Sequence, residues 1–320
     1  MPYTNNNNIS LSLAVWLLND TYDYNSDPNV ISVTTLLKPL RAIVLGRTIP
    51  STNTIDIADL IASRMGTAIH EAIEQAWKKP QGALKSLGYP DKIIDKLVIN
   101  PTLEKDILPI YMEKRSKKQV GPFTLSGKFD FIIDGQLEDF KSTSTWAWVF
   151  QSNVSDYKLQ GSMYRYLNQD IVDDDHIKIN YIFTDWSATK AKQDKDYPQS
   201  RIMSKQYPLM SVPETENWIR ARFKAIEAMQ KDPQVSLPQC TKEELWQSDS
   251  VWKYYKNPKN KARSTKNFTN PAPAYVRLAD DGSVGEVIEV PGEAKRCHYC
   301  NARPVCTQAQ NLELTGVLKI

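Results

Sequence analysis

The stretch over residues 125–142, LSGKFDFIIDGQLEDFKS, constrains the fold more than any other part of the chain. Its apolar residues alternate with polar ones, as in a half-buried β-strand. Asp134 and Gly135 then supply a hairpin-turn signal, because both central residues of a type I′ turn need a positive φ. A two-residue turn fixes the register of the two strands, and counting back from the turn places Asp130 opposite Asp139.

This register puts two carboxylates face to face, which is unfavourable because like charges across a ladder repel each other. A divalent cation held between Asp130 and Asp139 would remove that cost. Lys141 lies two residues beyond Asp139 on the same face of the strand, where an ammonium group can orient a water molecule or neutralise an oxyanion. The hairpin therefore predicts a cation site. Asp134 belongs to the turn, and Glu138 points to the opposite face.

Helices and strands are predicted on both sides of the hairpin. Helices are expected over 33–45 with a break at Pro39, over 54–79, over 89–118 in two pieces, over 156–170 and over 213–231, and strands over 177–185 and 201–209. Trp146 and Trp148 are expected in a loop. This order predicts an α/β core with a mixed sheet. Three segments are expected: 1–53 (helical and loop), 54–235 (core) and 236–320 (C-terminal).

Two helices beside the hairpin carry further polar residues. His70 lies on the 54–79 helix with Glu74 one turn away on the same face, and Gln160 and Tyr164 are one turn apart on the next helix. Each pair alone has an ordinary interpretation, since a lone histidine on an apolar helix is more often a hydrogen-bonded core residue. The order of the motifs along the chain is the more specific signal.

Four motifs in this order resemble those of RecB-type nucleases of the PD-(D/E)XK superfamily, over residues of roughly 60 to 170. They are GTAIH at 66–70, GKFD at 127–130, DFKS at 139–142 and QGSMY at 160–164. The resemblance implies a restriction-endonuclease-like core, in which helices flank a mixed central sheet. It also implies a DNA nuclease that hydrolyses phosphodiesters with Mg²⁺ or Mn²⁺. It is closest to stand-alone exonucleases of phages or prokaryotes.

The same resemblance assigns roles to individual residues. It implies that His70, Asp130 and Asp139 are metal ligands, with the Phe140 carbonyl as a further one. The catalytic residues that it implies are Asp130, Asp139, Lys141, Gln160 and Tyr164. Lys141 would position the attacking water, and Gln160 and Tyr164 would contact the substrate or support the site. Two aspartates and a histidine suit Mg²⁺ or Mn²⁺ and also accept Zn²⁺.

A second constellation consists of Cys240, Cys297, Cys300 and Cys306. Four thiolates can bind tetrahedral Zn²⁺ or a [4Fe–4S] cluster, and four unrelated thiols are the alternative. The C-terminal triplet resembles that of the Cas4-, AddB- and Dna2-like iron–sulfur nucleases, which favours the cluster. In those nucleases the fourth cysteine precedes the nuclease motifs, whereas Cys240 follows them. A metal here would tie the C-terminal segment to the core.

Basic and aromatic residues alternate between residues 246 and 266, a pattern that suits phosphates and stacked bases. The candidate nucleic-acid-binding residues are Lys253, Lys256, Lys259, Lys261 and Arg263. The alternative is a solvated surface with a few core aromatics. Arg41 and Arg47 are further candidates for phosphate contact.

The sequence shows no secretion signal and no apolar run of the length that a membrane span needs, so a soluble cytoplasmic protein is expected. It also has no Gly-x-x-x-x-Gly-Lys-Ser/Thr loop, so a helicase or recombination partner would be a separate protein. We expect a metal-dependent deoxyribonuclease, an exonuclease that acts on DNA ends or single strands in recombination or repair. The alternative is a DNA-binding recombination protein with a nuclease-like fold that is non-catalytic or cuts only within a complex.

Overall fold

The computed structural model describes residues 3–20, 25–49, 54–102, 106–231 and 237–319. Contacts divide the chain into two compact units. The first consists of Met1–Leu37 and Ser51–Ala225, and the second of Lys38–Pro50 and Ile226–Ile320. The N-terminal 53 residues were expected to form a segment of their own, but they are divided between the two units.

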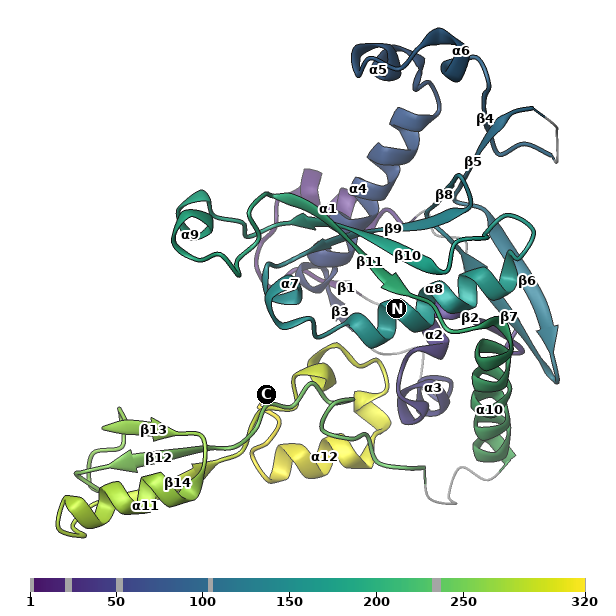
Figure 1. The fold of residues 1–320 in the computed structure, drawn as a ribbon. Coiled ribbons are helices and arrows are strands. Elements are labelled where there is room, and N and C mark those ends of the chain that lie inside the picture. The colour runs from purple at the N-terminus through teal and green to yellow at the C-terminus, as the bar shows by residue number, and fades with distance from the viewer. Residues whose placement is uncertain (1–2, 21–24, 50–53, 103–105, 232–236, 320) are drawn as a thin grey trace. The chain divides into compact units, whose positions relative to one another are not determined.

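A six-stranded mixed sheet is the centre of the first unit (Figure 1). Its order is β11 (Ile202–Pro208), β10 (His176–Phe183), β9 (Gln136–Thr143), β8 (Phe131–Ile133), β5 (Leu108–Met112) and β4 (Leu97–Ile99). The pairs β9–β10 and β4–β5 are parallel, and the other three pairs are antiparallel. The predicted α/β fold with a mixed sheet is confirmed.

Two smaller sheets complete the strands of this unit. β7 (Phe123–Lys128) lies between β2 (Val30–Ser32), to which it is parallel, and β6 (Arg115–Val120), to which it is antiparallel. β1 (Tyr3–Thr4) pairs in parallel with β3 (Ile55–Asp56).

The described helices of the chain are mostly short. Within the first unit they are α1 (Leu11–Leu18), α2 (Val33–Leu36), the 3₁₀ turn η1 (Ile57–Leu60), α4 (Ile61–Trp77), α5 (Gln81–Ser86), α6 (Asp91–Ile94), α7 (Trp146–Phe150), α8 (Val154–Leu167) and α9 (Ala188–Gln193). α10 (Val212–Lys231) runs from the first unit into the second. The predicted break at Pro39 is confirmed, because α2 ends before it and α3 (Leu40–Gly46) begins after it.

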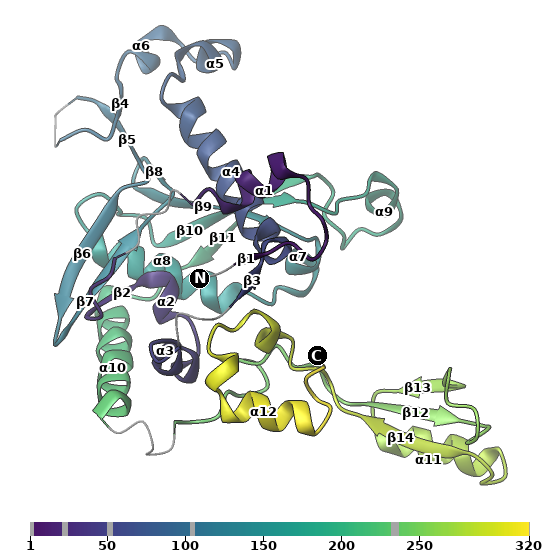
Figure 2. The same ribbon diagram turned by 180° about the vertical axis from the view of Figure 1, so that it is seen from behind.

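Helices α4 and α8 cover opposite faces of the six-stranded sheet. Phe140 of β9 meets His70 of α4, whereas Asp139, on the other face of the same strand, meets Gln160 of α8. Figure 1 shows α8 in front of the sheet, and Figure 2, from the opposite side, shows α4 in front of it. Gly161 allows the close approach of α8, since a Cβ there would lie 2.9 Å from the side chain of Ile177 on β10.

The predicted hairpin turn is confirmed. Asp134 and Gly135 have φ values of 50° and 72°, as a type I′ turn requires. A Cβ at Gly135 would also lie 1.6 Å from the carboxylate of Asp173, which would have to move, and the positive φ strains any other residue there. However, residues 125–142 are not one hairpin. Residues 125–128 belong to β7 in another sheet, and the hairpin consists of β8 and β9 alone.

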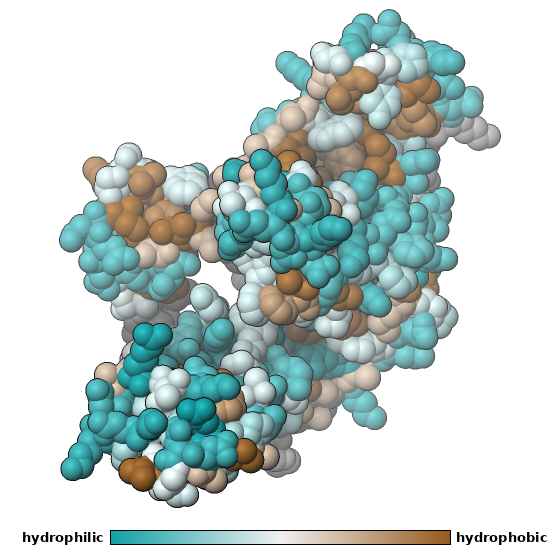
Figure 3. All heavy atoms as spheres, turned by 60° about the vertical axis from the view of Figure 1, so that its left-hand side comes forward, coloured by the Kyte–Doolittle hydropathy of each residue, from teal (hydrophilic) through white to brown (hydrophobic). Residues whose placement is uncertain are grey.

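The prediction of helices over 89–118 holds only for the short helix α6, because the rest of this region contains β4, β5 and most of β6. The apolar residues belong to a buried strand, since Ile110 and Met112 of β5 are buried and β5 lies between β4 and β8. Trp146 and Trp148, expected in a loop, lie on α7. Helix α4 has no buried residue, and Ile61 and Met65 on its apolar stripe are partly exposed. Figure 3 shows such apolar side chains, in brown, among the hydrophilic ones of the surface.

The second unit has a sheet and a core of its own. β12 (Val251–Tyr255) pairs in antiparallel fashion with β13 (Lys266–Phe268) and β14 (Glu286–Val290), beside α11 (Pro271–Asp280). The remaining elements are η2 (Lys295–Tyr299), η3 (Arg303–Val305) and α12 (Thr307–Leu314). A hydrophobic core of this unit consists of Leu245, Ala294, Cys297, Cys306, Ala309 and Leu318. Among the described residues of the whole chain, no helix is both long and apolar enough to cross a bilayer.

Candidate metal and catalytic site

Strand β9 and helix α8 bring three of the predicted site residues together. Asp139 and Lys141 share one face of β9, and the Lys141 ammonium lies 2.6 Å from Oδ2 of Asp139. Gln160 of α8 joins them, because its Nε2 donates to Oδ1 of Asp139 over 3.1 Å while its Oε1 accepts from Nζ of Lys141 over 3.3 Å. Gln160 thereby fixes the orientation of both charged groups. It also donates to the hydroxyl of Tyr164, which is buried one turn further along α8.

Asp130 lies at a gap in the hairpin ladder. The last pair of the ladder is Phe131 with Glu138, so Asp130 precedes β8 and is not a strand partner of Asp139 as expected. Instead, its Oδ2 accepts a hydrogen bond from the backbone nitrogen of Phe140 over 2.9 Å. The carboxylate therefore occupies the place of the missing strand partner.

His70 reaches the same gap from α4. Its Nδ1 lies 3.5 Å from Oδ2 of Asp130, and its Nε2 lies 2.9 Å from the Phe140 carbonyl oxygen. Burial disfavours the imidazolium, but Asp130, Asp139 and the carbonyl together outweigh that effect and raise the pKa of His70 to about 9. Without a metal, His70 is therefore positively charged at neutral pH.

Asp139 is the most deeply buried carboxylate of this group, with 1% of its surface exposed. Burial is the largest effect on its ionisation and, with Asp130, outweighs Lys141 and His70, so the pKa of Asp139 is raised to about 6. The pKa of Asp130 is lowered instead: burial opposes this, but the interactions with His70 and Lys141 outweigh it. Asp130 and Asp139 repel each other electrostatically, and a cation can supply the positive charge that such carboxylates need.

Glu113, which follows β5, is a site residue that the sequence did not reveal. One ligand atom each of His70, Glu113 and Asp130 lie within 4.8 Å of one another. An imidazole and two carboxylates are suitable ligands for Mn²⁺ or Mg²⁺. Glu113 also forms an ion pair with Lys128 over 2.5 Å. A correct prediction of β5 would have shown an acidic residue at the end of a central strand.

The expected metal set therefore differs from the observed grouping. His70 and Asp130 belong to it, Glu113 joins them, and Asp139 contacts Lys141 and Gln160. Oδ2 of Asp139 is fully buried, and the Lys141 ammonium 2.6 Å away supplies its positive charge. Glu74 lies outside this ligand group and pairs with Lys78 over 3.1 Å.

The four cysteines meet in the second unit. Cys297 and Cys306 are buried in its core, and Cys240 packs against them. Burial raises the pKa of the Cys240 thiol, and negative charge on the other three thiols raises it further. Gln308 holds the Cys240 backbone through two hydrogen bonds of 2.8 and 2.9 Å. Yet no three of the sulfur atoms lie within 4.8 Å of one another. Tetrahedral zinc, with bonds of about 2.3 Å, would hold its sulfur atoms about 3.8 Å apart.

Arg41, expected to contact phosphate, is buried beside these cysteines instead. Its Nε donates to Sγ of Cys306 over 3.2 Å, and its two terminal nitrogens donate to the Leu237 carbonyl and the Thr307 hydroxyl. All of these partners belong to the second unit. The sequence offered no signal for this role, because Arg41 and Cys306 are 265 residues apart.

The aromatic part of the basic stretch is largely structural. Tyr254 and Tyr255 of β12 are buried, so the alternative of core aromatics is correct for them. The predicted basic residues lie on β12 and in the loop to β13, namely Lys253, Lys256, Lys259, Lys261 and Arg263. Two of them are paired with acidic residues: Lys256 with Asp281 over 3.8 Å and Lys261 with Glu286 over 2.7 Å. Lys259 and Arg263 are exposed.

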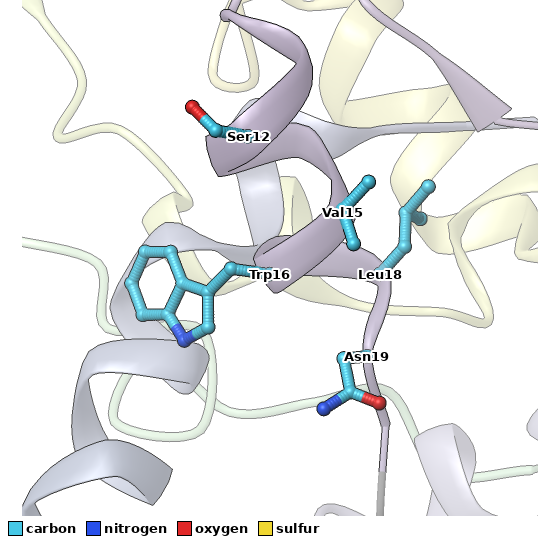
Figure 4. A pocket seen from close by; sticks show the side chains of 5 residues that line it. All are labelled: Ser12, Val15, Trp16, Leu18 and Asn19. Carbon is cyan, nitrogen blue, oxygen red and sulfur yellow. The ribbon is translucent and has the colours of Figure 1, made fainter.

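A surface hollow lies at α1, away from these clusters. It measures about 530 Å³ and is lined by Ser12, Val15, Trp16, Leu18 and Asn19 (Figure 4). Its lining is mainly apolar and carries no acid, base or nucleophile. It therefore offers no chemistry of its own.

Comparisons with known proteins leave the family open. No protein-family profile and no curated protein sequence matches the chain. Among solved structures, a protein described as SSO0001 resembles it with a TM-score of 0.41 and 14% sequence identity, covering 66% of this chain and 83% of that one.

Proposed function

We propose that this protein is a metal-dependent deoxyribonuclease with a core of the PD-(D/E)XK type. One observation supports the proposal most strongly. Residues from four separate segments meet around residues 139–141 of β9: His70 from α4, Asp130 from the ladder gap, Asp139 and Lys141 from β9, and Gln160 from α8. In this cluster a partly exposed ammonium and a partly exposed imidazole lie beside one fully buried and one largely buried carboxylate, an arrangement that is common at functional sites.

The residue types suit phosphodiester hydrolysis. A phosphodiester is anionic and repels hydroxide, and a divalent cation held by His70, Glu113 and Asp130 supplies charge that offsets this repulsion and lowers the pKa of water. Asp139 holds the Lys141 ammonium in place, and Gln160 keeps both from rotating. In this arrangement Lys141 orients the attacking water and stabilises the developing charge on the phosphate oxygens.

The proposed substrate is DNA, and the proposed enzyme is an exonuclease that acts on DNA ends or single strands. The experiment is digestion of end-labelled DNA, single- and double-stranded, linear and circular, with Mg²⁺ or Mn²⁺. We expect linear DNA to be degraded, circular DNA to persist and EDTA to abolish the reaction. Metal-independent digestion, or none with any of the substrates, contradicts the proposal. Digestion only after a helicase or recombination partner is added supports the alternative of a complex-dependent enzyme.

We further propose that Cys240, Cys297, Cys300 and Cys306 hold a [4Fe–4S] cluster rather than zinc. The support is that Cys240 packs against the buried Cys297 and Cys306, and that the triplet Cys297, Cys300 and Cys306 resembles that of the iron–sulfur nucleases. A cytoplasmic location, where thiols remain reduced, belongs to the same proposal. Anaerobically purified protein is expected to be brown and to contain about four iron atoms per chain. A colourless protein with one bound zinc contradicts the assignment.

A further inference from the structure

We propose that the outer face of α7 is a stacking platform for an unpaired base of the substrate strand, which makes single-stranded nucleic acid the preferred substrate. This inference rests on the proposed nuclease function. Trp146 and Phe150 lie one turn apart on α7 and are 60% and 55% exposed. Their ring centroids are 3.7 Å apart, with 31° between the planes. Such a ring pair can extend its stack onto a base, and every base has an aromatic face to offer.

Helix α7 holds these two rings in a fixed position. At its start, the Thr145 backbone nitrogen donates to Oδ1 of Asp185 over 2.7 Å. At its end, Oε1 of Gln151 accepts from Nζ of Lys205 and from the Tyr207 hydroxyl, over 3.0 and 2.9 Å. Because both ends are anchored, a base that stacks on the outer face would not have to order the helix first.

The inner face of α7 supplies the packing that the helix needs. Ala147 is buried, and the ring of Trp148 meets that of Tyr181 on β10 edge to face, with centroids 5.4 Å apart. Trp146 and Phe150 are therefore not required as core residues. Two large aromatic rings that remain exposed on an anchored helix point to a ligand with a flat apolar face.

The position of α7 connects it to the proposed catalytic residues. β9 carries Lys141 and ends at Thr143, and α7 begins at Trp146, all within the first unit. Since a strand rises about 3.3 Å per residue, the end of β9 lies about 7 Å from Lys141. A nucleic-acid strand with a phosphate at Lys141 would have its neighbouring nucleotides at α7.

Lys205 adds the charge that such a strand needs. It is exposed, its ammonium lies 5.7 Å from the ring centre of Trp148, and it forms a hydrogen bond with the neutral Gln151. Across the part of the chain that the structure describes, no carboxylate forms an ion pair with it. An exposed ammonium that Gln151 holds at the end of α7, and that no carboxylate neutralises, fits a phosphate next to a base better than it fits an apolar peptide. In duplex DNA the bases are already stacked and paired, so the platform favours single strands.

Binding to two oligonucleotides tests this proposal without any digestion. The first is oligo(dT) of about ten nucleotides, and the second is an abasic chain of equal length, which keeps the phosphates and lacks the bases. Fluorescence anisotropy in Ca²⁺ gives the ratio of the two affinities. We expect the wild type to prefer oligo(dT), and the double variant Trp146→Ala/Phe150→Ala to reduce that ratio by roughly 5- to 100-fold. Tyr275→Ala removes an equally exposed aromatic side chain of α11 and is expected to keep the wild-type ratio.

Each outcome distinguishes the platform from the nuclease proposal. An unchanged ratio in the double variant, or no binding of oligo(dT) by the wild type, overturns the platform whether or not the protein digests DNA. A ratio that falls in the double variant supports the platform, even if no digestion is found and the nuclease proposal fails. Circular dichroism of the double variant controls for folding. If that variant is unfolded, Trp146→Phe, which retains an aromatic ring, and Trp146→Leu, which does not, give the same comparison.

Discussion

The backbone nitrogen of Phe140 donates a hydrogen bond to Oδ2 of Asp130 over 2.9 Å, at the position where the ladder between β8 and β9 ends. The same oxygen is the atom that Nδ1 of His70 approaches. One carboxylate therefore completes the strand edge and also sets the ionisation of the histidine. Substitutions at Asp130 can separate these two roles.

Asp130→Asn is expected to keep the fold and lose the charge. The asparagine oxygen can still accept the hydrogen bond from Phe140, but the carboxylate that outweighs burial at His70 is gone. The pKa of His70 should therefore fall from about 9 towards its usual value of 6.5. Proton NMR titration can follow this change, because the chain has only three histidines. A His70 resonance that titrates equally in both proteins contradicts the described ion pair.

Metal affinity is expected to rise with pH between 7 and 9. In this range the metal-free His70 is an imidazolium, because its pKa is raised to about 9, and it must lose a proton to bind a metal. Asp139, with a pKa of about 6, is already ionised and adds no pH dependence there. Each unit of pH should therefore improve the apparent Mn²⁺ affinity by about tenfold. Calorimetry at three pH values measures this slope, and a flat profile shows that His70 is not a ligand.

Glu113→Gln is expected to weaken Mn²⁺ binding by roughly 10- to 100-fold, because one of three grouped ligands loses its charge. The matched control is Glu74→Gln. Glu74 is also half-buried and paired with a lysine, but it lies outside the ligand group. Equal Mn²⁺ affinities of the two variants, measured by electron paramagnetic resonance of free Mn²⁺, mean that Glu113 is not part of the site.

Gly161→Ala is expected to destabilise the first unit by about 1–3 kcal/mol, since overpacking forces neighbours apart. The new methyl group would lie 2.7 Å from Leu209 and 2.9 Å from Ile177. Gly82→Ala on α5 is the control, because nothing lies within 4 Å of its Cβ position, and it should be neutral or stabilising by up to about 1 kcal/mol. Urea unfolding followed by circular dichroism compares the two. Equal midpoints mean that α8 is not packed closely against β10.

The sequence predicts the parts of this fold whose signals are local. The Asp134–Gly135 turn follows from its positive φ requirement, and α8 follows from its spacing of apolar residues. The strands over 97–120 could not be read in this way, because an apolar run such as Leu108–Met112 does not separate a buried strand from a helix. The sequence prediction extended the pairing of β8 with β9 one residue too far, to Asp130. The pairing stops at Phe131 because the residues before Phe129 belong to another sheet.

The site was predictable where residues share a strand or helix face, and not where distant segments meet. Asp139 and Lys141 follow from strand alternation, and Gln160 and Tyr164 from helical spacing. Glu113 and Arg41 depend on contacts between segments that no local pattern encodes. Tyr254 shows the reverse case, since composition suggested a base-stacking residue where tertiary packing made a core residue.

The measurement that tests the account most directly compares DNA digestion by the wild type and by Asp139→Asn in Mn²⁺. Asparagine keeps the size of the side chain and the acceptor for Gln160, but it removes the charge that holds Lys141. Asp134→Asn, in the turn of the same hairpin, is the matched control, because asparagine tolerates its positive φ. The account predicts that the wild type and Asp134→Asn digest end-labelled linear DNA, while Asp139→Asn is slower by at least about 100-fold. Equal digestion by Asp139→Asn and the wild type would contradict the central claim.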